Sequence, residues 1–228
     1  MLRFLVQFFA HELGPVELVV YILSITYVCL CATPLHEFAH AFVAVKLGDD
    51  TPKLRGRLTI NPMAHIDPIG ILMIFLFGFG YAKPVETRIR NFKKPKRDMA
   101  LVALAGPMSN FIQAFIYLLI ASVCARFVPN MSALLYIYIF FDFAATINIF
   151  LAVFNMLPIP PLDGSKVLAA FLPAKIYFKL MQYERFISIG LMILLFTRVL
   201  TVPLEYISYG IKYVFEIVIN IPLSFIIG

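Results

Sequence analysis

A continuous apolar run from about Leu18 to Val45 limits what this chain can fold into more than any other feature. About 20 helical residues cross the hydrocarbon core of a bilayer, so a run of this length predicts a membrane-spanning helix. The composition agrees, since 61% of the 228 residues are hydrophobic and only 14% are charged. A water-soluble domain cannot bury that much apolar surface, so the soluble fold classes are excluded.

The second half of this run carries polar residues in the pattern His36-Glu37-Phe38-Ala39-His40. Helical spacing places the two histidines one turn apart on one face, where both imidazoles can reach a single ion. Glu37 then projects beside that ion, where its carboxylate can remove a proton from a bound water. Because ionisable groups inside a hydrocarbon-length segment cost free energy, we interpret this cluster as functional.

Four further apolar runs predict additional spans, at about residues 99–127, 132–157, 186–200 and 204–227. The fold class that follows is an all-α polytopic membrane protein with about five transmembrane helices. Residues 174–185, between the third and fourth spans, predict a short surface helix with a basic stripe.

The stretch between the first two spans predicts a small membrane-associated β-hairpin or sheet. Residues 53–60 alternate between apolar and polar side chains, and a period of two is typical of a strand. Residues 69–81 are apolar and rich in glycine but too short for a spanning helix, which favours a buried strand or a re-entrant hairpin. We expect these segments to offer a sheet edge to which an extended peptide can add.

The basic residues indicate how the chain crosses the membrane. Loops 46–68, 83–98 and 158–185 hold 15 of the 19 Lys and Arg residues, and the predicted spans place all three loops on one side. Because basic loops face the cytoplasm, we expect a multi-pass protein of a prokaryotic cell membrane with its N-terminus outside and its C-terminus inside. The net charge of +6 then reflects the membrane topology and basic loops that face the anionic lipid bilayer, which argues against nucleic-acid binding.

Two histidines do not complete a catalytic zinc site, which takes three protein ligands and an open position for water. The remaining candidates near membrane level are Asp142, Asp163 and His65. Asp163 follows a proline-rich segment just past the end of a predicted span, and the prolines prevent the helix from continuing. The backbone beyond them is therefore free to turn back toward the histidines.

Several further motifs follow the histidine pair along the chain. They are Arg57-Leu58-Thr59-Ile60-Asn61-Pro62 with His65, Asp67-Pro68 and Gly70; Ala105-Gly106-Pro107 with Asn110; and Asn155-Met156-Leu157-Pro158-Ile159-Pro160-Pro161-Leu162-Asp163-Gly164. In combination with the first motif they resemble the site-2 protease family of intramembrane zinc metalloproteases. The resemblance runs from about Pro34 to Gly164 and takes a minimal form, without a PDZ or CBS domain.

The resemblance implies that His36, His40 and Asp163 bind one Zn²⁺ ion and that Glu37 is the general base. Zinc lowers the pKa of a coordinated water to around 7, which suits a hydrolytic reaction at neutral pH. The carboxylate of Asp163 would also offset part of the charge of the ion in an apolar interior.

Asn155 and His65 each have a functional and a structural interpretation. The resemblance places Asn155 near the site, where its amide could stabilise the oxyanion or simply make a helix-packing hydrogen bond. His65 could bind a substrate carbonyl or steady its own turn. We expect Asp142 to serve helix packing, since the resemblance already supplies all three metal ligands, and Asn148 to form a hydrogen bond between helices.

The implied function is an intramembrane zinc metalloprotease that hydrolyses peptide bonds of membrane-spanning substrate proteins, as in regulated intramembrane proteolysis. We expect one membrane-embedded domain over residues 1–228, with a catalytic core at about 18–168 and C-terminal helices at about 174–227. The alternative is a non-proteolytic membrane adaptor or transporter that binds metal for structure. Glu37 distinguishes the two, because a structural metal needs no base beside it.

Overall fold

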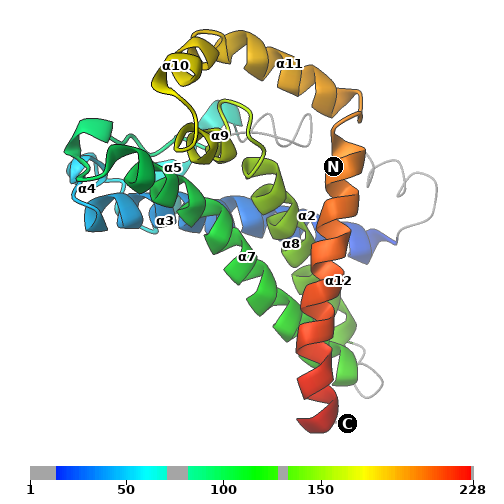
Figure 1. Cartoon of the computed structure of the whole chain (residues 1–228). Coiled ribbons are helices and arrows are strands. Elements are labelled where there is room, and N and C mark those ends of the chain that lie inside the picture. Colours follow the sequence, from blue (N-terminus) through cyan, green and yellow to red (C-terminus); the bar gives the residue numbers. More distant parts are fainter. Residues whose placement is uncertain (1–13, 71–81, 128–132, 227–228) are drawn as a thin grey trace.

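The computed structural model describes residues 14–70, 82–127 and 133–226, and in this part of the chain it contains helices and no strand (Figure 1). The helices are α2 (Pro15–Tyr27), η1 (Val28–Ala32), α3 (Thr33–Lys46), α4 (Thr51–Leu54), α5 (Pro62–His65), η2 (Ile89–Asn91), α7 (Pro95–Phe127), α8 (Ala133–Asn155), α9 (Asp163–Ala169), α10 (Ala174–Gln182), α11 (Glu184–Phe196) and α12 (Thr201–Ile226).

The first span is one continuous rod in which a π-helical turn, η1, joins α2 to α3. Pro34 would disrupt a regular helix here, because it has no N–H and its ring crowds the carbonyl four residues earlier. The wider turn accommodates the proline, and the Thr33 hydroxyl donates to the Val28 carbonyl at 3.2 Å. The turn ends one helical turn before His36, so it influences the direction in which the histidine face of α3 projects.

Glycine ends α3 and turns the chain. Gly48 has a φ of +106°, a conformation that side-chain-bearing residues rarely adopt. Its N–H donates to Val45 O at 3.1 Å, and the N–H of Asp49 donates to Ala44 O at 3.0 Å. These two bonds form a Schellman motif, which satisfies carbonyls that the helix end leaves free.

The hydrophobic core lies where α7, α8 and α12 meet the π-helical turn (Figure 1). Four fully buried alanines allow the helix backbones to approach closely, and they are Ala32, Ala114, Ala144 and Ala145. Larger side chains such as Leu118 and Ile149 fill the space between them. Small residues at helix contacts are typical of helices that associate in lipid.

Three helical segments of the described chain are long and apolar enough to cross a membrane: Pro15–Lys46, α7 and α8. Large apolar side chains are exposed along them, including Val19, Ile112 and Leu135. Exposed apolar surface of this extent suits contact with lipid and would be unfavourable in water. The prediction of an all-α protein with several spans therefore holds in this coarser form.

The prediction of about five spans is not supported, because the last two predicted spans are not among these three segments. Helix α11 has only 13 residues, which rise about 20 Å against a hydrocarbon thickness of about 30 Å. A turn containing Arg198 at a φ of 61° separates it from α12. Helix α12 has 26 residues, but Glu205, Lys212 and Glu216 reduce its apolar character.

The strand predicted at residues 53–60 does not form, which corrects the hairpin prediction. The segment begins inside α4, and Gly56 then turns the chain with a φ of +67°. Side chains satisfy the nearby backbone: His65 Nε2 donates to Thr59 O at 2.8 Å, and the Arg57 guanidinium donates to Ala64 O. The N–H groups of residues 54–57 are bonded within the turn of α4, so they are not available to the ladder that a strand would need. Residues 71–81, the rest of the predicted hairpin and its sheet edge, lie outside the described residues.

Two polar residues of α8 have now defined contacts. Asp142 Oδ1 lies 2.6 Å from Lys212 Nζ, so an ion pair joins α8 to α12, and the same ammonium donates to Thr146 Oγ1 at 3.1 Å. Asn148 is fully buried and donates to Ala144 O within its own helix at 2.9 Å. Asp142 thus serves helix packing as expected, whereas Asn148 bonds its own helix and not a neighbour. The expected surface helix is present as α10.

Candidate metal centre

Three side chains from α3 and α9 converge on one point. His36 Nε2 and His40 Nε2 lie 3.0 Å apart, and Asp163 Oδ2 lies 3.0 Å from His40 Nε2 and 3.3 Å from His36 Nε2. All three residues are buried, with at most 7% of their surface exposed. The i, i+4 spacing brings the histidines together, and the tertiary fold adds an aspartate 123 positions after His40.

The tautomer of His40 is fixed by α7. His40 Nδ1 lies 2.7 Å from the carbonyl oxygen of Val102, which can only accept a hydrogen bond. The proton of a neutral imidazole is therefore on Nδ1, and the lone pair of Nε2 faces the convergence point. Histidine ligands of metal ions are usually oriented by an acceptor that binds the other ring N–H in this way.

Gly106 allows α7 to pass directly over the two imidazoles. A Cβ atom at this position would overlap the Nε2 atoms of both His36 and His40. The following residue, Pro107, is fully buried in the same helix. The small-residue motif therefore serves close approach of α7 to the ligand face of α3.

Asp163 reaches the histidines because α8 ends at Asn155 and the chain folds back. A tight turn follows, in which Ile159 N donates to Leu157 O at 2.8 Å and Leu162 N donates to Ile159 O at 2.9 Å. Gly164 then packs against the end of α8, where a Cβ atom would overlap the carbonyl oxygens of Met156 and Leu157. This glycine holds the start of α9 against the end of α8.

The geometry of the three ligand atoms suits a zinc ion. Bonds of about 2.0–2.2 Å in a tetrahedral site place neighbouring ligand atoms roughly 3.3–3.6 Å apart. The observed separations of 3.0, 3.0 and 3.3 Å reach or lie slightly below this range. Two imidazole nitrogens and one carboxylate oxygen are a donor set that zinc proteases use, with the fourth position open. Among the described residues, this is the group of His, Cys, Asp and Glu side chains that could hold a metal ion.

Asp163 is held as an anion. Burial alone would raise the pKa of its carboxyl group, and the positive charge of Lys166 beside it acts in the opposite direction by favouring the ionised form. Lys166 Nζ lies 3.2 Å from Asp163 Oδ1, on the side away from the histidines. The residue is therefore an ionised ligand at neutral pH.

Glu37 is half-buried beside the histidine pair and bonds to a different segment of the chain. Its Oε2 accepts a hydrogen bond from the backbone N–H of Val85 at 3.2 Å. Val85 belongs to a stretch without regular secondary structure over residues 82–88, which is held near its start by a bond from Lys83 N to His65 O at 2.8 Å. The glutamate is thereby oriented by a backbone donor, and it has no ion-pair partner in the part of the chain that the structure describes.

Asp49 anchors the other end of the stretch over residues 82–88. Its carboxylate is fully buried and accepts from Arg88 N at 2.6 Å, from Asn91 Nδ2 at 2.7 Å and from Thr51 N at 3.1 Å. Burial alone would raise the pKa of Asp49, but the bonds from Thr51, Arg88 and Asn91 stabilise the charge and hold the pKa below its ordinary value. The loop after α3 is thus tied to the segment that contacts Glu37.

We expect Asp49→Asn to destabilise the protein at neutral pH by about 2 kcal/mol, since it removes buried hydrogen bonds to a charged acceptor. Because the folded pKa is depressed, the contribution of Asp49 is present above the unfolded pKa of about 4 and is lost as pH falls through the folded pKa. The unfolding temperature in detergent, measured between pH 7 and pH 3, should therefore fall less steeply for the variant than for wild type.

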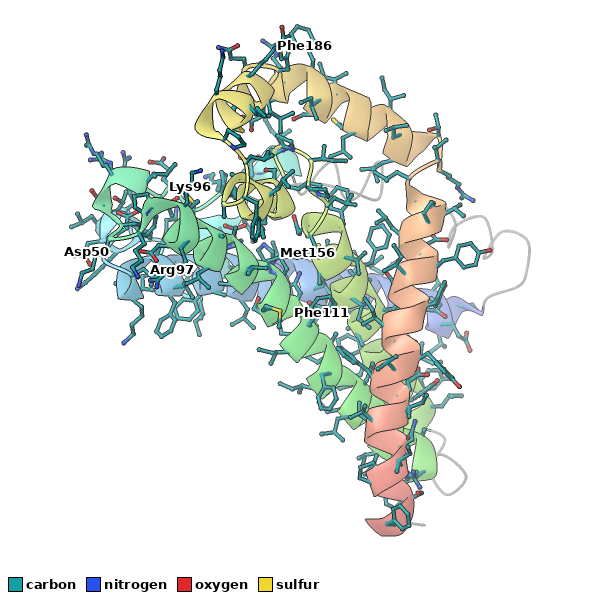
Figure 2. All side chains as sticks on the ribbon, in the orientation of Figure 1. Asp50, Lys96, Arg97, Phe111, Met156 and Phe186 are labelled. Atoms are coloured by element: carbon teal, nitrogen blue, oxygen red, sulfur yellow. The ribbon has the colours of Figure 1, made fainter. Side chains whose placement is uncertain are left out.

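Asp50→Asn is the matched control, because its side chain is exposed and lies at the neighbouring position (Figure 2). This control should unfold like the wild type at every pH. Equal acid sensitivity of wild type and Asp49→Asn would show that the buried carboxylate does not stabilise this loop.

Two predicted site residues make their contacts elsewhere. Asn155 Nδ2 donates to Leu151 O of its own helix at 3.0 Å, and an amide NH₂ group has a second N–H to offer. His65 is fully buried, with its Nε2 bonded to Thr59 O and its backbone carbonyl bonded to Lys83. These contacts favour the turn-stabilising reading of His65.

Three contributors to the site were not predicted from the sequence. Two are backbone groups, the Val102 carbonyl and the Val85 N–H, and no sequence pattern identifies such groups. The third is Lys166, whose i, i+3 spacing from Asp163 on a helix is a signal that could have been used.

Known proteins resemble this chain at the level of a family and of individual relatives. The model of peptidase family M50 matches residues 128–200, a stretch that contains Asp163 but not the histidine pair. A Bacillus subtilis protein named "Putative zinc metalloprotease YwhC" is 41% identical over 165 residues, which cover 72% of this chain and 75% of that protein.

More distant relatives carry similar names. A Mycobacterium tuberculosis protein named "Putative zinc metalloprotease Rip2" is 33% identical over 73% of this chain and 63% of its own length. A Methanocaldococcus jannaschii protein named "Putative zinc metalloprotease MJ0611" is 38% identical over 44% of this chain and 49% of its own length. No solved structure matches the chain at a significant level.

Proposed function

Because the chain belongs to peptidase family M50, the site-2 protease family, we propose that it is an intramembrane zinc metalloprotease that hydrolyses peptide bonds of membrane-spanning proteins. The membrane character rests on three helical segments that are long and apolar enough to span a bilayer. The names of the relatives support a zinc metallopeptidase, and the choice of membrane-spanning substrates is our proposal.

The observation that carries the proposal is the convergence of His36, His40 and Asp163 beside Glu37. Their ligand atoms lie within 4.8 Å of one another and come from a membrane-length helix and a short helix packed on α7. Two imidazoles and a carboxylate rarely gather in a buried position without a bound ion, because each group loses its contact with water. The open side of such a group can receive a substrate carbonyl and a water.

When bound, Zn²⁺ would act as a Lewis acid that polarises the scissile carbonyl and lowers the pKa of a coordinated water to about 7. Glu37 would accept the proton of the attacking water on its carboxylate and deliver it to the leaving nitrogen as the peptide bond breaks. The bond from Val85 N–H to Oε2 leaves Oε1 available for this transfer. Asn155 would donate its second amide N–H to the oxygen on which negative charge develops.

The proposed topology follows from three crossings. With the start of α2 outside, an odd number of spans places the stretch that follows α8, including Asp163 and α9, on the cytoplasmic side. The loop between α3 and α7 lies on the same side, so the most basic loops face the cytoplasm of a prokaryotic cell. The site would then open toward the cytoplasm.

Removing the metal tests the proposal. The protein would be reconstituted into vesicles with membrane proteins from a strain that lacks it, and new fragments would be identified by mass spectrometry. We expect fragments with the untreated protein, no fragments after treatment with 1,10-phenanthroline, and fragments again after Zn²⁺ is restored. Cleavage that persists after zinc has been removed would contradict a zinc-dependent reaction.

The same assay distinguishes the protease from a non-proteolytic metal-binding adaptor or transporter. An adaptor would keep its bound zinc but release no fragments under any condition. Glu37 favours the protease, since a metal held only for structure needs no base at its side.

A further inference from the structure

We propose that Lys166 is a positioning residue for the metal centre, which holds the Asp163 carboxylate so that only one of its oxygens faces the ion. This inference rests on the proposed zinc site. Lys166 contacts no other ligand and is one turn along α9 from Asp163.

The two oxygens of Asp163 have different partners. Oδ2 lies 3.0 Å from His40 Nε2 and 3.3 Å from His36 Nε2, whereas Oδ1 lies 3.2 Å from Lys166 Nζ. A carboxylate with both oxygens free can bind a metal through one oxygen or through two. The ammonium group competes for Oδ1 and so favours binding through Oδ2 alone. A coordination position then stays open for the reacting groups.

The charge of Lys166 acts in the same direction as this geometry. Asp163 and Glu37 bring two negative charges to a buried site, and a neighbouring cation stabilises the ionised ligand. The side chain of Asp163 is only 9% exposed while that of Lys166 is 40% exposed, so the ammonium remains hydrated. Most surface ion pairs at i, i+3 contribute little to stability, and the distinction here is that the acidic partner is a buried ligand.

Zinc affinity measured by chelator competition on the purified full-length protein tests the proposal without an activity assay. We expect Lys166→Met to bind Zn²⁺ at least roughly tenfold more weakly, because groups that orient a metal ligand typically contribute about 10- to 100-fold to metal affinity. Lys166→Arg should stay close to wild type, because it keeps a cation that can reach Oδ1. Lys96→Met is the matched control (Figure 2). The Lys96 ammonium donates to the carbonyl of Leu172, just beyond the end of α9, and bonds none of the three metal-binding side chains.

The absorption spectrum of the Co²⁺-substituted protein is the second readout. Four-coordinate Co²⁺ absorbs more strongly in the visible region than five-coordinate Co²⁺, so Lys166→Met should weaken these bands if Asp163 then binds through both oxygens. Lys166→Met with the affinity and the spectrum of wild type would overturn the positioning role. A wild-type protein that binds no zinc would overturn the proposed function as well, so the two failures are distinguishable.

Discussion

Replacing Glu37 with Gln is expected to reduce peptide hydrolysis by roughly 10²- to 10⁴-fold, the range that general acid–base catalysis contributes. Glutamine has the same shape and can still accept the hydrogen bond from Val85 N–H, but its amide cannot take a proton from water at neutral pH. The metal ligands are untouched. Fragment release in the vesicle assay and zinc content of the purified variant should therefore separate, with the first lost and the second retained.

Glu86→Gln is the control for this change. Glu86 is exposed, lies next to Val85 and forms an ion pair with Arg55 at 3.5 Å on the surface. It should cleave at the wild-type rate, because an exposed pair of this kind contributes little. If Glu37→Gln cleaved as fast as wild type, the protein would use a different base or a different reaction.

Gly106→Ala is expected to abolish zinc binding, at a position where the chemical change is one methyl group. The added Cβ would overlap both Nε2 atoms, so either the imidazoles rotate away from the convergence point or α7 moves off α3. In either case the ligand atoms separate and His40 Nδ1 loses its bond to Val102 O. Zinc affinity measured by chelator competition should fall by more than the roughly 10- to 100-fold that is typical when a group that orients a metal ligand is removed.

Gly190→Ala on α11 provides the matched control, because a Cβ atom there has no neighbour within 4 Å. This substitution should leave zinc binding unchanged and stabilise the helix slightly, since alanine favours the helical state over glycine. Zinc binding by Gly106→Ala equal to that of Gly190→Ala would mean that α7 does not cover the ligands as described.

The helical periodicity of α3 allowed half of the candidate site to be predicted from local sequence. An i, i+4 pair must share a face wherever the helix forms, so the contact of His36 with His40 needed no knowledge of the fold. Asp163 is different, because it lies 123 positions beyond His40 and is brought back by a turn of seven residues and by Gly164. Its place beside the histidines depended on the family resemblance.

The hairpin prediction failed for an identifiable reason. Alternation of apolar and polar residues shows only that a strand could have two unlike faces, whereas a strand forms when its backbone groups find a partner. Within residues 53–60 the Thr59 carbonyl is bonded by the His65 side chain, and the N–H groups of residues 54–57 are bonded within the helical turn of α4. The histidine that was considered for substrate binding is thus part of what replaces the strand.

The last two spans show the limit of counting apolar residues. Residues 186–200 are apolar enough, but a turn at Arg198 ends α11 before it reaches the length of a span. In α12 the ion pair of Lys212 with Asp142 shows that a charged residue in a long apolar helix can be matched by its neighbour. Such pairing depends on which helices pack together and is not evident from either segment alone.

If α3 and α9 jointly hold one zinc ion, the purified protein must contain zinc and protein in equal molar amounts. The zinc-to-protein ratio of the purified protein measures this. Elemental analysis should give one zinc per chain for wild type and almost none for Asp163→Ala, although that variant keeps both histidines of α3. A wild-type protein without zinc, or an Asp163→Ala variant that retains the full amount, would contradict the claim.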